Sequence, residues 1–233
     1  MLSQAVIERF VSTGMSDLSE SSRRSARANL RFVARRVVPR LAPASPAPIA
    51  RSPLPSPYRP GEVAAMFCLA EHQPSLARRM RLQGLLCLGL GAGLSGSDLR
   101  HVTGRHVRRH GTGVVVVVEG NRQRTVPVLA RYGDRLVESA RFAKGNYVTG
   151  GATPERRNLT ARLVKDLAGG QDVVGIDPSR LRVTFLVEVS EMIGLKALLA
   201  VCGIASSGRL GAIAAHCTEV GLEEALVLFG GAR

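Results

Sequence analysis

The sequence contains no tryptophan, three tyrosines and six phenylalanines among its 233 residues, so aromatic side chains are scarce at 4%. Hydrophobic residues nonetheless reach an ordinary 45%, and the core must therefore be built mainly from alanine, valine and leucine. No apolar run approaches the roughly 20 residues that a membrane span needs, since the longest candidate covers only residues 85–94. We expect a soluble chain with no membrane partner.

Targeting signals and paired cysteines are also missing. The first residues lack the charged-then-apolar pattern of a signal peptide, which favours a cytoplasmic protein. The four cysteines stand far apart and none belongs to a CxxC pair, so we interpret them as buried free thiols, with disulfides or a metal cluster as the alternatives. They are Cys68, Cys87, Cys202 and Cys217.

Three histidines lie close together in the sequence without forming a metal motif. His101, His106 and His110 have no cysteine or carboxylate beside them that would complete a zinc ligand set. A basic loop is the simpler interpretation of this cluster. The sequence therefore predicts neither a metal site nor a cofactor.

Acidic residues are few, and the resulting charge is the strongest signal in the sequence. Against 18 Asp and Glu there are 32 Lys and Arg, which gives a formal net charge of +14. Only three of the 32 bases are lysine, and the planar arginine fork suits bidentate contact with phosphate. A GC-rich genome would explain part of the excess of arginine over lysine. For the positive net charge, a solubilising surface is the alternative explanation. The imbalance favours a polyanionic partner.

Proline divides the chain. Residues 39–60 hold eight of the twelve prolines, which exclude regular helix and favour an extended, semi-rigid tether. The sequence therefore predicts a short helical unit at residues 1–38, this proline-rich linker at 39–60, a main domain at 61–217 and a C-terminal helix or tail at 218–233.

The first unit is predicted to hold a helix at residues 19–38, opened by Ser19 or Ser21, after a shorter helix near residues 4–11. Four arginines recur every four residues. Like charges at this spacing repel, so the stripe indicates either contact with a phosphate backbone or a solvated face. The predicted apolar face holds Ala26, Leu30, Val33 and Val37, and the arginine stripe holds Arg23, Arg27, Arg31 and Arg35.

The main domain alternates between helical and strand-like patterns. The turns HGTG and EGN contain the glycine and asparagine that hairpins need, and they join three short strands. The predicted fold is mainly α-helical with a small three-stranded antiparallel sheet. The predicted helices are 61–72, 75–90, 130–142, 156–168, 179–193, 195–202, 207–217 and 222–229, and the strands are 105–109, 114–118 and 122–129.

Three motifs occur in an order that resembles the tyrosine recombinase, or phage integrase-like, family. They are GLSGSDL at residues 93–99, GNRQRTVPV at 120–128 and LRVTF at 181–185. The resemblance covers residues 59–217 and implies the catalytic-domain fold of that family, preceded by a shortened form of its helical core-binding domain. It also implies two domains that clamp duplex DNA from opposite sides.

The resemblance further implies an active site of two arginines, a lysine, a histidine, a later histidine or tryptophan, and a tyrosine that attacks a DNA phosphate. Arg182 matches the second arginine. The first arginine, the lysine, the histidine and the later histidine or tryptophan are replaced, in that order, by Ser95, Glu119, Ser179 and Ile204.

The expected nucleophile is missing as well. The resemblance places it near residues 211–217, whereas the three tyrosines are Tyr58, Tyr132 and Tyr147. Glu119 would repel a phosphate in this pocket, or it is only a turn residue that points to solvent. Because each lost oxyanion-type donor costs about 10²–10³ in rate, the sequence predicts a catalytically inactive member, a pseudoenzyme.

The leading functional hypothesis is an inactive recombinase-like protein that binds double-stranded DNA in the nucleoid, as a regulator, an architectural factor or a competitor of an active recombinase. Phosphate contacts position a protein without reading sequence, so we expect modest sequence preference. The predicted DNA contacts are Arg23, Arg27, Arg31, Arg35, Arg105, Arg108, Arg109, Arg122, Arg124 and Arg182.

Two alternatives stay open. The first is an enzyme in which a partner protein supplies the tyrosine, or in which Ser206 or Ser207 attacks with His216 as its base. The second is a protein-interaction module whose C-terminal helix docks on another copy to form a homo-oligomer, unless this helix packs on its own domain. The apolar positions of that helix are Leu222, Ala225, Leu226 and Phe229.

Overall fold

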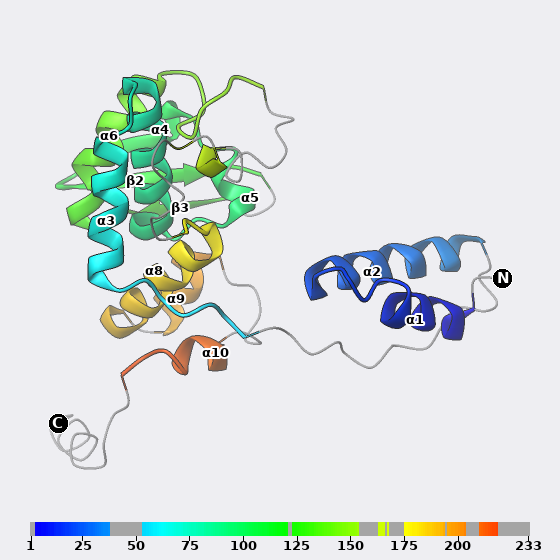
Figure 1. Cartoon of the computed structure of the whole chain (residues 1–233). Helices are drawn as coiled ribbons and strands as arrows, with labels where there is room; N and C mark the ends of the chain where they lie inside the picture. Colours follow the sequence, from blue (N-terminus) through cyan, green and yellow to red (C-terminus); the bar gives the residue numbers. More distant parts are fainter. Residues whose placement is uncertain are drawn as a thin grey trace, which may run out of the picture. The chain divides into compact units, whose positions relative to one another are not determined.

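The computed structural model divides the chain into two compact units, Met1–Pro53 and Leu54–Arg233 (Figure 1). The structure describes residues 3–37, 53–120, 123–153, 163–165, 167, 175–193, 195–203 and 210–218. The predicted helix at 222–229, most of the one at 156–168 and most of the linker therefore lie outside the described residues.

Helices make up most of the described elements, and one three-stranded antiparallel sheet completes them, which confirms the predicted fold class. The first unit contains α1 (Gln4–Thr13) and α2 (Glu20–Val37). The second contains α3 (Pro60–Glu71), α4 (Leu76–Leu86), η2 (Cys87–Gly91), α5 (Gly96–Leu99), η3 (Gly104–His106), β1 (Val107–His110), β2 (Gly113–Val118), β3 (Arg124–Pro127), α6 (Ala130–Ala143), α8 (Pro178–Met192), α9 (Leu195–Cys202) and α10 (Leu210–Ala214).

The apolar face predicted for α2 is only partly the buried one. Ala34 packs with Ile7 and Val11 of α1, whereas Val33 is 44% exposed and Val37 is 66% exposed. Successive residues lie about 100° apart around a helix. Val33 therefore points away from α1 when its neighbour Ala34 faces α1. The first unit therefore has a very small core and exposes apolar side chains.

The sheet has the order β1-β2-β3, and both pairings are antiparallel. Val116 of β2 pairs with Val107 of β1 and with Val126 of β3. Alternate valines of β2 are buried, as expected for a strand with one face on the core. Both predicted hairpin turns hold a glycine with positive φ, +55° at Gly111 and +92° at Gly120, a backbone conformation that glycine adopts readily.

The helices of the second unit pack against this sheet and against one another (Figure 1). α6 packs on β1 and β2, α4 packs between α3 and α6, and α8 packs on α9, which in turn reaches β3. The core is mainly leucine and valine, as the composition predicted. Its few aromatic residues include Phe67 and Tyr132, whose rings stack with centroids 5.7 Å apart.

The helical segment predicted for residues 75–90 is confirmed, but it is not α-helical throughout. α4 stops at Leu86 and continues as the π-helical turn η2. Two glycines in η2 lie against other helices, since a Cβ on Gly89 would lie 2.8 Å from Leu181 Cβ and one on Gly91 would lie 2.9 Å from Tyr132 Cβ. This close packing fixes the chain where it enters the GLSGSDL turn.

The four cysteines are free thiols, but the prediction that all are buried is wrong. Cys87 and Cys202 are buried, whereas Cys68 is exposed and Cys217 is half-buried. Cys68 lies on the outer face of α3, where its Sγ is 3.6 Å from His72 Nδ1. Burial raises the pKa of the Cys87 thiol to about 12, so this group is an inert part of the core.

Candidate nucleic-acid interface

The GLSGSDL turn is anchored on α8 by a glycine. Gly93 has a φ of +56°, and a Cβ at this position would lie 2.1 Å from Cδ1 of Phe185. The next residue, Leu94, donates its backbone N–H to Leu88 O at 3.1 Å and closes the π-helical turn. Both the backbone conformation and the space therefore require glycine here.

Ser95 follows, at the position where the resemblance expects the first arginine. It caps α5: its Oγ accepts from the Asp98 N–H at 3.3 Å and lies 2.7 Å from Asp98 Oδ2. The Asp98 carboxylate in turn accepts the Ser95 N–H at 3.2 Å. This reciprocal arrangement is a capping box, so Ser95 has a structural task in the turn.

Asp98 also forms a buried ion pair with Arg124 of β3. Arg124 Nη2 lies 3.0 Å from Asp98 Oδ2, and both side chains are only 10% exposed. Burial acts to raise the pKa of Asp98, but the hydrogen bonds from Ser95 and Arg124 outweigh it and hold the pKa below its usual range. The carboxylate is therefore ionised at neutral pH and compensates the charge of Arg124.

Arg182, which matches the second arginine of the resemblance, is held by backbone carbonyls. Its guanidinium donates to Gly93 O and, at 2.7 Å, to Cys202 O. It thereby joins the turn to the end of α9. The Arg124 guanidinium also lies near the end of α9, because a Cβ on Gly203 would lie 3.0 Å from Arg124 Cζ. The structure thus brings Arg124 and Arg182 together around the turn.

The hairpin position of the expected lysine is occupied by a partly paired carboxylate. Glu119 is 65% exposed, and its Oε1 lies 3.4 Å from His106 Nε2. The other ring nitrogen of His106 accepts the Thr103 N–H at 3.1 Å. Glu119 therefore contacts a histidine and also faces solvent.

The remaining positions of the expected site add no charged group among the described residues. Ser179 is exposed in the first turn of α8, and its N–H donates to Asp177 Oδ1 at 2.8 Å. In the window expected for the nucleophile, Ile213 is 3% exposed and His216 is half-buried. Ile204, Ser206 and Ser207 lie outside the described residues.

We call the site around the GLSGSDL turn the recombinase-like centre, after the resemblance of the sequence, and define it as Ser95, Asp98, Glu119, Arg124 and Arg182. A cavity of about 680 Å³ opens beside this centre. Its lining includes Asp98, His101, His106, Glu119 and Tyr147. Although two histidines and two carboxylates meet there, no group of three or more such side chains within the described part of the chain has an arrangement that could hold a metal ion.

The arginine stripe predicted on α2 is not uniform. Arg31 is 7% exposed, and Arg27 donates from Nε to Glu8 Oε1 of α1 at 2.9 Å. Arg23 is half-buried, whereas Arg35 is exposed. The stripe thus runs from the helix–helix contact to the open surface, so its four members differ in their access to a ligand.

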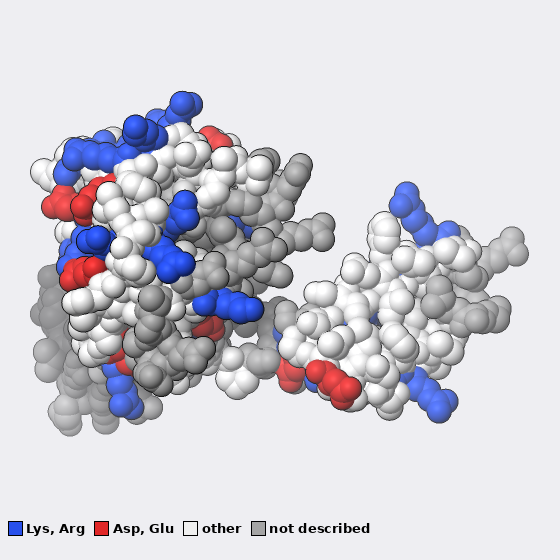
Figure 2. Space-filling model, turned by 45° about the horizontal axis from the view of Figure 1, so that its top comes forward, with Lys and Arg blue, Asp and Glu red and all other residues white. Residues whose placement is uncertain are grey.

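The other arginines that were predicted to contact DNA differ in the same way. Arg105, Arg108 and Arg109 are exposed, whereas Arg124 and Arg182 lie in the recombinase-like centre. Arg122 lies outside the described residues. Figure 2 shows lysine and arginine gathered along one edge of the second unit, with fewer acidic side chains among them.

None of the described helices is long and apolar enough to cross a membrane.

Sequence reasoning missed two features of this unit. The first is the Asp98–Arg124 pair, although the spacing Ser-x-x-Asp is a readable capping-box signal. The second is a pair of cations on α6 and its C-terminal end, Arg141 and Lys144, which line another cavity. Lys144 follows the end of α6 with a φ of +53°, so helix periodicity gave no signal for this pair.

Comparison with known proteins supports the fold. No protein-family model matches this chain, and no curated protein sequence is significantly similar to it. Solved structures do match: XerA recombinase has a TM-score of 0.52 at 15% identity, covering 100% of this chain and 83% of its own. XerH recombinase bound to palindromic difH DNA after cleavage has a TM-score of 0.64 at 12% identity, covering 98% and 72%.

The Tn1549 transposon integrase in complex with a circular intermediate DNA gives a TM-score of 0.61 at 13% identity, covering 98% of this chain and 85% of that one. Identities this low establish similarity of fold and nothing finer. The chain therefore has the fold of tyrosine recombinases and integrases.

Proposed function

We propose that this protein binds duplex DNA, mainly through phosphate contacts, and does not cleave it. Its fold resembles that of tyrosine recombinases whose structures contain DNA. Its net charge of +14 suits a polyanion, and phosphate contacts dominate such binding. A regulatory or architectural role in the nucleoid follows from binding without cleavage.

The observation that carries the proposal is the hydrogen bonding of Arg182. Catalysis of phosphoryl transfer needs donors aimed at the oxygens where charge develops. Here two guanidinium nitrogens of Arg182 donate to the carbonyls of Gly93 and Cys202. The nearby Arg124 is paired with Asp98. These hydrogen bonds support a structural task for the retained arginine.

The replaced positions support the same proposal. Ser95 and Ser179 carry no charge that would stabilise an attacked phosphate, and Glu119 carries the wrong sign. Tyrosine is missing from the window around Ile213. Because several donors of the family's site are absent together, the loss of rate is expected to exceed the factor of about 10²–10³ for one donor.

The test is binding of the full chain to a labelled 40-base-pair duplex, analysed on a native gel and on a denaturing gel. We expect a shifted band on the native gel and no band of covalent protein–DNA product on the denaturing gel, including with a nicked substrate that traps such a product. A covalent band would overturn the proposed inactivity. Absence of any shift at low salt would overturn DNA binding.

Self-association is a second candidate function, favoured by the exposed apolar residues of the first unit. Phe10 is 51% exposed and Phe32 is 61% exposed, although the core beside them is very small. Burial of these two exposed aromatic side chains against a second copy would stabilise a dimer. The C-terminal segment on which the sequence hypothesis relied lies outside the described residues.

The expected result for self-association is a dimer in sedimentation equilibrium whose dissociation constant rises at least about tenfold in a Phe10→Ser/Phe32→Ser variant, because two buried aromatic contacts are lost. The matched control is Leu76→Ser on α4, where a side chain 54% exposed is removed from the other unit. A wild-type chain that stays monomeric at all concentrations would contradict this second function.

A further inference from the structure

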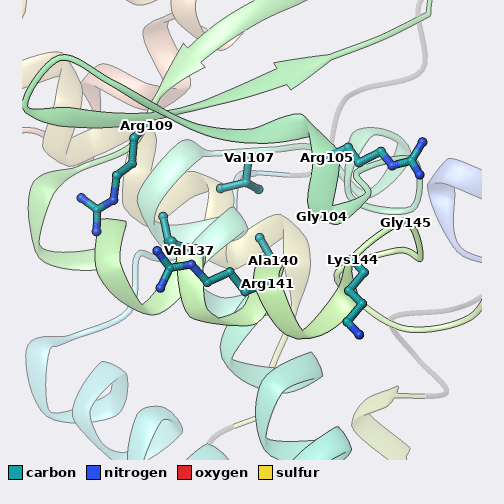
Figure 3. A pocket seen from close by; sticks show the side chains of 9 residues that line it. All are labelled: Gly104, Arg105, Val107, Arg109, Val137, Ala140, Arg141, Lys144 and Gly145. Atoms are coloured by element: carbon teal, nitrogen blue, oxygen red, sulfur yellow. The ribbon is translucent and has the colours of Figure 1, made fainter.

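A second cavity, of about 400 Å³, lies between β1 and α6 (Figure 3). It shares no lining residue with the cavity beside the recombinase-like centre. Four of its nine lining residues are cationic and none is acidic. The cationic residues are Arg105, Arg109, Arg141 and Lys144, and all four are exposed.

The frame of this cavity is fixed by direct backbone contact. A Cβ on Gly104 would lie 2.2 Å from Ala140 O, so η3 touches α6 without an intervening side chain. The Gly104 N–H donates to Asn146 O at 3.1 Å and closes the same end. Between the strand and the helix, Val107 and Val137 supply an apolar floor. The cationic side chains therefore stand on a rigid frame.

The net charge of this cavity is positive and therefore favours an anionic ligand. The C-terminal end of α6 contributes a partial negative charge of about −0.5. The four cationic side chains of the cavity outweigh this charge. The carbonyls of Ala140 and Ala143 already accept the N–H groups of Lys144 and Asn146. Arg109 pairs with Asp134, but these side chains are 57% and 88% exposed. Exposed pairs of this kind are weak, so an anion can replace the carboxylate.

The cations are distributed over both ends of the floor. Figure 3 shows Arg109 and Arg141 extending at one end, and Arg105 and Lys144 extending at the other. A ligand with more than one charged group can therefore contact both pairs while its carbon atoms lie on the valines between them. Arginine binds phosphate oxygens in a bidentate manner, and lysine adds a point charge.

We propose that the β1–α6 cavity binds a phosphate-bearing ligand. The phosphates come either from a free polyphosphate, such as that of a nucleotide, or from the backbone of a nucleic acid. The site is separate from the recombinase-like centre. With a free polyphosphate it goes beyond the proposed function, and with a nucleic-acid backbone it deepens that function and rests on it. Arg105 and Arg109, which the sequence assigned to DNA contact, belong to this site together with Arg141 and Lys144.

The test is calorimetric titration of the full chain with sodium tripolyphosphate at low salt, compared between two variants. Arg141→Glu/Lys144→Glu reverses two charges of the cavity. Arg78→Glu/Arg79→Glu makes the same change of net charge on the exposed surface of α4, away from the cavity. Circular dichroism and thermal unfolding establish that both variants are folded.

We expect saturable binding to the wild type, weakened at least about tenfold in the cavity variant because charge-assisted hydrogen bonds are lost, and changed less than about twofold in the control. Absence of saturable binding to the wild type, or an equal loss in both variants, would overturn the site. The second outcome would mean that only the overall charge matters.

Competition with a 40-base-pair duplex then identifies the source of the phosphate. Displacement of tripolyphosphate by the duplex assigns the site to nucleic-acid backbone, and retention assigns it to a free polyphosphate. Both outcomes support a phosphate site. Failure of the proposed function has a different signature, because tripolyphosphate would then bind while the duplex does not bind at all.

Discussion

Replacement of Asp98 by asparagine is expected to lower the free energy of unfolding by about 3–5 kcal/mol, the range for breaking one side of a buried ion pair. Asparagine has nearly the same size, so the change removes charge rather than volume. Arg124, whose side chain is 10% exposed, would lose this counter-charge in a place where water cannot replace it. Urea denaturation of wild type and variant at pH 7 measures the difference.

The same carboxylate makes stability depend on pH. The pKa of Asp98 is held below its usual value in the folded protein, so its contribution is fully present above the unfolded pKa of about 3.9 and is lost as the pH falls through the lower folded value. The wild type is therefore expected to lose stability below about pH 4 more steeply than Asp98→Asn.

The matched control is Asp134→Asn, which breaks the exposed pair with Arg109. Because solvent screens that pair, we expect no measurable change in stability. A double variant, Asp98→Asn/Arg124→Met, should recover part of the loss, since the buried charge is removed along with its partner. Equal stability of Asp98→Asn and wild type would show that the pair makes no contribution to the fold.

Binding to duplex DNA is expected to weaken by about 10³-fold or more between 50 and 200 mM salt, the loss that accompanies six or more phosphate contacts. The reason is counterion release, which depends on the number of phosphates neutralised and very little on base sequence. Fluorescence anisotropy with two duplexes of unrelated sequence measures both properties. A shallow salt dependence, or a strong preference for one duplex, would contradict a binding mode dominated by phosphates.

Single substitutions refine this prediction. Arg35→Ala on α2 removes an exposed member of the predicted stripe, and it should reduce the slope of log affinity against log salt by about 1. Arg79→Ala, an exposed arginine on α4 that was not assigned to DNA contact, should leave the slope unchanged. Equal effects of both substitutions would assign the binding to overall charge alone.

Much of the fold could be read from local patterns. The valine run 114–118 and its flanking glycines predicted a central strand with two hairpin turns, which the structure confirms. Likewise, the sequence offered Ser19 or Ser21 as the start of α2, and the structure favours Ser19, whose Oγ accepts the Ser22 N–H at 3.2 Å. Such features depend on residues close in sequence, so turn chemistry and periodicity are sufficient to find them.

Several misses share a different cause, because they depend on residues far apart in sequence. The π-helical turn η2 holds two glycines that lie against Leu181 and Tyr132, and helix periodicity carries no information about these neighbours. Similarly, the burial of Arg31 depends on how α1 lies against α2. The replaced positions of the centre were visible in the sequence, but the hydrogen bonds that hold Arg182 required the structure.

The hydrogen bonds of Arg182 have a consequence for the order of folding. Its guanidinium contacts a carbonyl 89 residues earlier in the chain and another 20 residues later. Contacts of such long separation close late, because the entropy of the intervening loop must be lost first. Interactions absent from the transition state act mainly on the unfolding rate. We therefore expect that substitution of Arg182 raises the unfolding rate of the domain more than it lowers the folding rate.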